Sequence, residues 1–205
     1  MSKNSGFSLI ELVIVVVVLG ILAVTALPRF LDVTEEAKNA SVEGVAGGFA
    51  TGVSLTRAQW EAIGRPKEAA KNVVIYDGTK LYLTTPTDAE INAGTVSPGY
   101  PMTNVNEDVT PSSLTPAKCE AVWNSILQNP PRITSNFNDV SGQGDFYKFY
   151  VTTTSSGTDT SCLFYLVNSL DKGGNGLYLN PGSDTGSFKN FTYKPATGQV
   201  SANIN

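Results

Sequence analysis

The sequence has no histidine and only two cysteines, Cys119 and Cys162. Histidine is the commonest general base and metal ligand near neutral pH, so its absence removes the most frequent centres of acid–base and metal chemistry. Two cysteines without histidine cannot complete a tetrahedral zinc site within one chain. The run Asp171–Gly176 lacks the alternating acidic ligands of a calcium loop. With no phosphate loop and no nucleophile elbow, the sequence predicts no enzyme, no metal site and no cofactor.

Positive charge is scarce as well. Lys and Arg number 14 against 18 Asp and Glu, which gives a net charge of −4. Because nucleic acids attract proteins mainly through positive charge, we expect no nucleic-acid partner. Ser, Thr, Asn and Gly are abundant after residue 75, with short runs of Tyr and Phe between them. This composition is typical of a β-rich extracellular domain. In an oxidising compartment Cys119 and Cys162 would form one disulfide, the alternative being two buried thiols.

A long apolar run stands near the N-terminus. Residues 7–28 contain one charged residue, Glu11, and as a helix they would span roughly 33 Å, enough to cross a bilayer core. An ordinary signal peptide cut after Ala26 is one interpretation, but only Lys3 supplies the basic region. A plain membrane anchor is another, and it leaves Glu11 unexplained. Such a carboxylate costs about 2.5–3.5 kcal/mol on insertion scales, so Glu11 indicates a function that needs a partner.

The residues Gly6-Phe7-Ser8-Leu9-Ile10-Glu11 supply a third interpretation. They resemble the prepilin signature of type IV pilins, with Gly20 and Pro28 in the expected places, over about the first 40 residues. The resemblance implies that a peptidase cleaves between Gly6 and Phe7 and then methylates the new amino terminus of Phe7. It also implies that Glu11 neutralises the amine of Phe7 on a neighbouring helix during filament assembly. The alternative is a tolerated carboxylate near the cytoplasmic interface.

Two residues interrupt the helical pattern of the apolar run. Proline lacks the amide donor of a helix interior, so we expect a helix break or kink at Pro28. The resemblance extends this break to the segment between Gly20 and Pro28, where the helix melts in several filaments of the family. Beyond Pro28 the apolar residues recur at steps of three and four up to Trp60, which predicts an amphipathic helix that ends at Gly64.

Glycines recur every fourth residue in this second helical segment, at Gly44, Gly48 and Gly52. Each costs roughly 1 kcal/mol relative to alanine in a helix, which close approach of another element would justify. We therefore expect the β-sheet of the same chain, or a neighbouring subunit, to lie against this stripe. A locally frayed helix is the alternative.

The remaining sequence predicts a β-rich head. Asp77-Gly78 between two β-prone runs indicates a hairpin over 73–83. A long loop from Thr84 to about Leu114 and a short helix beginning at Thr115-Pro116 follow. Further strands are expected at 146–153, 160–167, 177–179, 187–193 and 199–204. The fold class is α+β, the type IV pilin lollipop, in which a long N-terminal helix packs on an antiparallel β-sheet head.

Four segments follow from this interpretation. They are a leader peptide at 1–6, a transmembrane or filament-core half-helix at 7–28, an amphipathic half-helix at 29–64 and the globular head at 65–205. The resemblance implies a precursor in the inner membrane, single-pass with a cytoplasmic N-terminus, and then an extracellular pilus.

The resemblance implies a structural subunit of a type IV pilus that is used for adhesion. The stretch Pro28–Val33 looks closest to mannose-sensitive haemagglutinin (MSHA)-type pilins. The implied partners are the prepilin peptidase/methylase, other pilin subunits in a homopolymer, an inner-membrane assembly platform and host or surface glycans. A minor pilin or a type II secretion pseudopilin is one alternative. A carbohydrate-binding tip adhesin, with Tyr100 available for sugar stacking, is the other.

Overall fold

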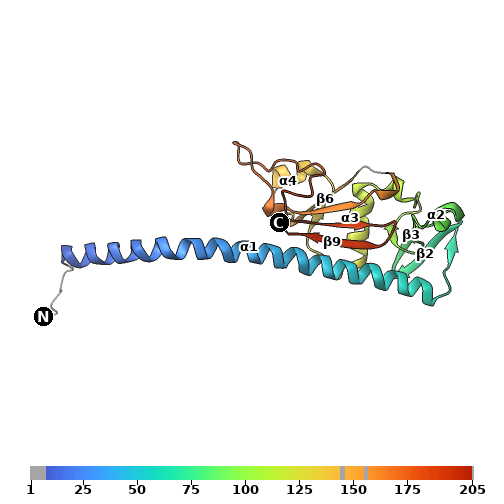
Figure 1. The fold of residues 1–205 in the computed structure, drawn as a ribbon, viewed down its shortest axis with the longest axis horizontal. Coiled ribbons are helices and arrows are strands. Elements are labelled where there is room, and N and C mark those ends of the chain that lie inside the picture. Colours follow the sequence, from blue (N-terminus) through green and yellow to red (C-terminus); the bar gives the residue numbers. More distant parts are fainter. Residues whose placement is uncertain (1–7, 144–145, 155–156, 205) are drawn as a thin grey trace. The chain divides into compact units, whose positions relative to one another are not determined.

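A computed structural model describes residues 8–143, 146–154 and 157–204 of the chain (Figure 1). The chain forms two units, one up to Asn39 and one from Ala40 onward. Helix α1 (Leu9–Ala62) supplies all of the described secondary structure of the first unit and the opening element of the second. The long N-terminal helix and the antiparallel sheets that follow it confirm the predicted α+β class.

In the second unit, α1 buries one face of the amphipathic pattern, including Val42, Phe49, Val53 and Trp60. The helix ends as predicted at Gly64, whose φ of 86° is in the left-handed region that favours glycine. The backbone N–H of Arg65 then donates to the carbonyl of Trp60 at 2.9 Å, which satisfies one of the last free carbonyls of the helix.

The first sheet contains four antiparallel strands in the order β1-β2-β3-β4. Their bounds are β1 (Lys67–Glu68), β2 (Lys71–Tyr76), β3 (Thr79–Leu83) and β4 (Pro101–Thr103). The predicted hairpin is confirmed, because Asp77 and Gly78 both have positive φ and connect β2 to β3. The predicted loop after Thr84 is wrong in part. It contains α2 (Asp88–Ala93), β4 and the 3₁₀ turn η1 (Pro111–Ser113), and α2 starts with a capping box between Thr87 and Glu90.

The second sheet contains five strands in the order β5-β6-β7-β8-β9, antiparallel except for the parallel pair β5–β6. Their bounds are β5 (Ile133–Thr134), β6 (Phe149–Thr153), β7 (Cys162–Leu166), β8 (Asn190–Lys194) and β9 (Gln199–Asn203). The predicted strand at 177–179 is wrong. Only Tyr178 forms a bridge there, to Lys172, because no neighbouring strand lies alongside the rest of the segment. Helix α4 (Phe137–Gln143) and the turns η2 (Gly157–Asp159) and η3 (Val167–Ser169) complete the unit.

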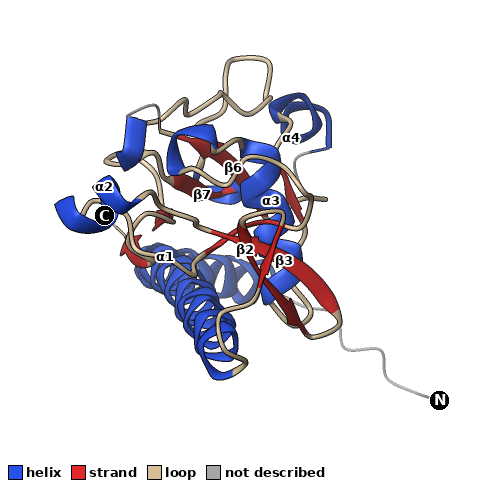
Figure 2. Ribbon diagram, turned by 90° about the vertical axis from the view of Figure 1, so that its right-hand side faces the viewer, coloured by secondary structure: helices blue, strands red, loops and turns tan. Residues whose placement is uncertain are grey.

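Helix α3 (Pro116–Ile126) joins the two sheets. It begins as predicted, with Thr115 as the N-cap and proline in the first turn. Strands of both sheets contact α3 (Figure 2). Its Trp123 is fully buried beside Phe49 of α1, and both rings pack on aromatic side chains of the second sheet, with the centroids of Trp123 and Phe164 5.1 Å apart. A single aromatic core therefore connects α1, α3 and the second sheet.

The glycine stripe of α1 has the end of α3 against it at Gly48 and Gly52, so the predicted cover by the β-sheet is wrong. Contact with a neighbouring subunit, the other predicted cover, stays a prediction. A Cβ added to Gly52 would lie 2.8 Å from the carbonyl oxygen of Ile126, and one on Gly48 would lie 3.7 Å from the side chain of Leu127. Only glycine allows this approach at position 52, because any side chain would meet the backbone of Ile126. A Cβ on Gly44 would meet nothing within 4 Å. The glycines lie within regular helix, so the frayed alternative is wrong as well.

Candidate assembly site

Helix α1 begins with a reciprocal pair of hydrogen bonds between Ser8 and Glu11. The backbone N–H of Ser8 donates to Oε2 of Glu11 at 2.8 Å, and the backbone N–H of Glu11 donates to Oγ of Ser8 at 3.3 Å. This is a capping box, in which two side chains satisfy amide groups that the first turn leaves free. The S-x-x-E spacing of Ser8 and Glu11 is visible in the sequence, but neither role predicted for Glu11 was that of a helix cap. The box fixes the carboxylate beside the start of the helix, where its negative charge is favoured by the positive end of the helix dipole.

Two of the predicted site residues, Gly6 and Phe7, lie outside the described residues. Cleavage between them, methylation of Phe7 and the pairing of Phe7 with Glu11 therefore remain predictions. What the described residues establish is the position of Glu11 in the first turn of α1.

From Leu12 to Pro28 the surface of α1 is apolar around its whole circumference, and charged residues begin again at Arg29. All of its large hydrophobic residues from Leu9 to Val33 are exposed, by 47% to 82%. Such a helix is stable where lipid or other apolar helices surround it, and unfavourable in water. By length and composition α1 is able to cross a membrane, a property that signal sequences share.

Gly20 and Pro28 both lie inside α1, and the helix is continuous through them. Proline has no amide hydrogen, so the carbonyl of Val24 lacks its usual helical donor. A Cβ added to Gly20 would have no atom of the described chain within 4 Å, so no other part of the chain supports the helix there. These two positions are thus the weakest points of the helix backbone in the first unit. The helix break between them stays a prediction for the assembled filament.

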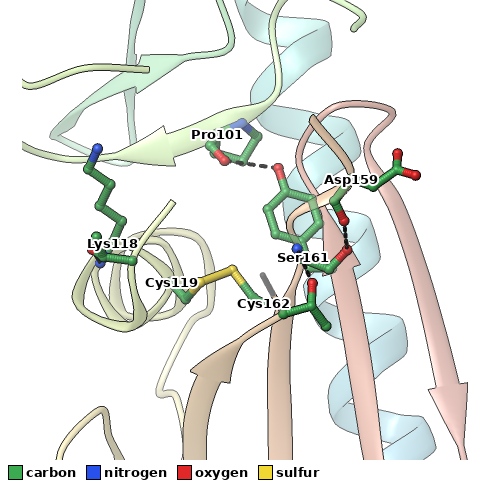
Figure 3. The surroundings of a disulfide bond; sticks show 9 residues. Pro101, Lys118, Cys119, Asp159, Ser161 and Cys162 are labelled. Carbon is green, nitrogen blue, oxygen red and sulfur yellow. Dashed lines mark hydrogen bonds between the residues drawn. A yellow bond between two sulfur atoms is a disulfide. The ribbon is translucent and has the colours of Figure 1, made fainter. Parts of the chain in front are cut away.

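The predicted disulfide is present between Cys119 of α3 and Cys162 of β7 (Figure 3). Both residues are fully buried, and the bridge ties α3 to a central strand of the second sheet. Nearby, the hydroxyl of Tyr193 donates to the carbonyl of Pro101 at 2.9 Å and so connects the second sheet to the first (Figure 3). Burial raises the pKa of this hydroxyl well above the usual tyrosine value, so the bond persists as a neutral donor.

Tyr100, the residue considered for sugar stacking, is engaged inside the second unit. Its hydroxyl accepts a hydrogen bond from Arg57, whose guanidinium lies over the ring at 4.5 Å. The ring also packs so closely on Gly198 that a Cβ there would clash with it. Since these contacts occupy the ring, Tyr100 offers no open platform for a sugar. Within residues 8–143, 146–154 and 157–204 there is also no cluster of three or more Cys, Asp or Glu residues that could hold a metal ion.

Comparisons with known proteins support the interpretation of the N-terminal region. Residues 1–27 match the family described as the Prokaryotic N-terminal methylation motif. The chain is similar to the type IV narrow pilus major component PilA5 of Thermus thermophilus, with 41% identity over 61 residues, or 30% of this chain and 53% of that protein. It is also similar to a fimbrial protein of Moraxella nonliquefaciens, with 35% identity over 74 residues, or 36% of this chain and 48% of that one.

The chain spans about half the length of these curated relatives, 53% and 48% of them. No solved structure matches it. The methylation motif, matched at residues 1–27, and the two relatives support the type IV pilin family. Together with the apolar α1, they fit a membrane-anchored precursor that is assembled into an extracellular pilus.

Proposed function

We propose that this chain is a structural, non-enzymatic subunit of a type IV pilus. The observation that carries the proposal is the methylation motif at residues 1–27, which overlaps the start of a helix whose large apolar side chains are all exposed as far as Val33. A surface of this kind needs a membrane before assembly and a bundle of similar helices afterwards. The pilus proteins to which part of the chain is similar support the second of these environments.

Processing and assembly follow from the same residues. A prepilin peptidase cleaves the leader 1–6 after Gly6 and methylates Phe7, and residues 7–28 then move from the inner membrane into the filament core. Glu11 pairs there with the amine of Phe7 on a neighbouring copy. At an effective dielectric of 20, unit charges 4 Å apart attract by about 4 kcal/mol, and desolvation offsets much of this. The pair therefore acts mainly on register, because a helix at the wrong height leaves a charge unpaired.

The capping box adds a step to this scheme. In the unassembled chain, Oε2 of Glu11 accepts the Ser8 N–H at 2.8 Å, so the carboxylate is held at the helix start before any neighbour arrives. Its remaining acceptor capacity is sufficient for an amine from another copy. Helix capping and register selection therefore use one side chain.

The finer assignment concerns the type of pilus. We propose a pilus of the MSHA type used for adhesion, on the strength of the stretch Pro28–Val33 that begins the amphipathic segment 29–64. The inner-membrane assembly platform and surface glycans are further partners of this proposal, with the head 65–205 on the outside of the filament.

Mass spectrometry of the N-terminus tests the proposed function. The protein is taken from sheared surface filaments and, separately, from membranes. Abundant filaments whose chains begin at methylated Phe7 support a major pilin. The same terminus found only in membranes replaces this proposal by a minor pilin or a type II secretion pseudopilin. A chain that begins after Ala26 contradicts all three assignments.

A further inference from the structure

A cleft of about 190 Å³ lies in the second unit, where the end of α1 meets the first sheet. Three parts of the chain that are distant in sequence form it: the end of α1 with the following turn, the β1–β2 hairpin and the segment around α2. The residues that matter to its chemistry are Trp60, Arg65, Lys67, Asn72, Ile91 and Pro98. The volume lies below the roughly 300–1,000 Å³ of drug-sized pockets, so the cleft has room for a ligand of about one sugar ring.

The side chain of Asn72 supplies an acceptor that the protein leaves unused. Asn72 is only 2% exposed, and its Nδ2 donates to the carbonyl of Thr84 at 2.8 Å. Its Oδ1 is buried and has no hydrogen-bond partner among the residues that the structure describes. Buried amide oxygens are normally paired because an unpaired one has lost its bonds to water. Asn72 is one of the residues that line the cleft, so a small shift of its side chain would present this unused acceptor to a ligand hydroxyl.

Two cations stand at the rim of the same cleft. Lys67 lies directly opposite Asn72 in the β1–β2 pairing, so the two side chains share a face of the sheet. Its ammonium has no ion-pair or hydrogen-bond partner in the described part of the chain. Arg65 donates from Nε to the Glu61 carboxylate at 2.5 Å, and its side chain is 63% exposed. In the described part of the chain, its two terminal nitrogens make no hydrogen bond.

The backbone holds Arg65 at this rim. Its φ of 56° lies in the left-handed region, directly after the left-handed Gly64, so the chain turns sharply away from α1 there. The remaining wall is apolar: Trp60 of α1, Ile91 of α2 and Pro98. The cleft thus combines an inner neutral acceptor, an apolar wall and two outer cations.

We propose that this cleft binds a carboxylated sugar, such as a hexuronic acid residue. The carboxylate binds Lys67 and the terminal nitrogens of Arg65 in charge-assisted hydrogen bonds. The Asn72 side chain shifts toward the cleft so that a ring hydroxyl donates to its Oδ1, and the C–H face of the ring packs on Ile91 and Pro98. The inference gives a ligand class to the adhesive role in the proposed function and rests on that function only for its biological setting. Binding itself does not require filament assembly.

The test uses the full-length protein in detergent, titrated with sodium D-glucuronate and followed by calorimetry and by saturation-transfer NMR. Methyl glucoside is the neutral control ligand, and acetate is the control that has a carboxylate alone. The variant Lys67→Gln removes one rim cation at an exposed position. The matched control Lys71→Gln makes the same change one residue before Asn72, where the lysine instead bonds to Asn106 at 2.8 Å.

We expect saturable glucuronate binding to the wild type and to Lys71→Gln, with affinity lowered about tenfold or more in Lys67→Gln and in Arg65→Gln. Both control ligands should bind at least about tenfold more weakly than glucuronate. The inference would be overturned if the wild type shows no saturable glucuronate binding up to about 10 mM. It would also be overturned if Lys67→Gln binds glucuronate as tightly as the wild type does, or if the wild type binds acetate or methyl glucoside as tightly as glucuronate. Counting surface filaments of Lys67→Gln separates the two proposals. If the chain forms filaments but does not bind glucuronate, the proposed pilus function stands and the cleft proposal fails. If the chain binds glucuronate but forms no filaments, the cleft proposal stands and the pilus function fails.

Discussion

The two units of this protein use the same kind of residue in opposite ways. Val18 of the first unit is 49% exposed, whereas Val53, on the same helix in the second unit, is 1% exposed. The second unit covers its valines with α3 and two sheets, whereas residues 8–39, the described part of the first unit, contain α1 alone. Because burial of apolar surface is the main source of folded stability, the second unit supplies its own stability and the first depends on its surroundings. Variants that affect one unit and not the other test this difference.

The largest effect is expected at the aromatic core. Trp123→Ala removes a fully buried ring that packs on Phe49 and Phe164, and we expect it to lower the free energy of unfolding of the second unit by about 3–5 kcal/mol. Urea unfolding of the full-length chain in detergent, followed through the fluorescence of Trp60, measures this change. The matched variant Val18→Ala should leave the same transition unchanged. A comparable loss from Val18→Ala would show that the two units are not independent.

The disulfide is expected to have the next largest effect. Replacing Cys119 and Cys162 together by serine releases a loop of 43 residues, and we expect a loss of about 2–4 kcal/mol in the same unfolding transition. Reduction of the wild type by dithiothreitol should produce a similar loss. If the double variant and the reduced wild type both unfold at the urea concentration of the oxidised protein, the bridge does not stabilise the second unit.

Two glycines of α1 provide a matched pair of smaller changes. Gly52→Ala places a Cβ 2.8 Å from the carbonyl of Ile126, so we expect a destabilisation of about 1–3 kcal/mol. Gly44→Ala meets nothing within 4 Å and should stabilise the helix by up to about 1 kcal/mol. Thermal unfolding followed by circular dichroism distinguishes the two. A shift of the same sign in both variants would contradict the packing of α3 against the stripe.

The capping box of the first unit is expected to have the smallest effect on stability. Ser8→Ala removes the acceptor for the Glu11 amide, which should cost about 0.5–2 kcal/mol of helix stability. Hydrogen exchange of the first-turn amides in micelles should accelerate in this variant, and Ser8→Thr should restore the slow exchange. Unchanged exchange in Ser8→Ala would show that the box does not hold the helix start.

Local signals account for most of what could be predicted. Asp77-Gly78 and Thr115-Pro116 determine a turn and a helix start through their own backbone preferences, and both were predicted. Helix α2 was missed although its capping box, Thr87 with Glu90, is as local, because the Thr/Pro/Asn composition around it favoured a loop. The strand at 177–179 was wrong because pairing depends on a distant neighbour. Strand β5 was missed for the same reason, since its two residues pair with β6 some 16 residues later.

The candidate sites also differ in how far they could be predicted from local sequence. The prepilin motif is contiguous, so it was predictable residue by residue from the sequence. The disulfide required only that two cysteines meet. The Asn72 cleft could not be predicted, because it combines residues from α1, the β1–β2 hairpin and the α2 region that only the folded chain brings together.

The central claim is that other copies of the chain cover the apolar surface of α1. The most direct test uses single cysteines, since both native cysteines are in the disulfide. The test variant is Val16→Cys, at a position that is 60% exposed in the isolated chain, and the control is Ser112→Cys, at an exposed position of the second unit. Each variant is treated with N-ethylmaleimide, once in sheared filaments and once after the filaments are dissociated in SDS. We predict that Cys at position 16 is protected in filaments and reacts after dissociation, while Cys at 112 reacts in both. Equal labelling at position 16 in both conditions would contradict the account.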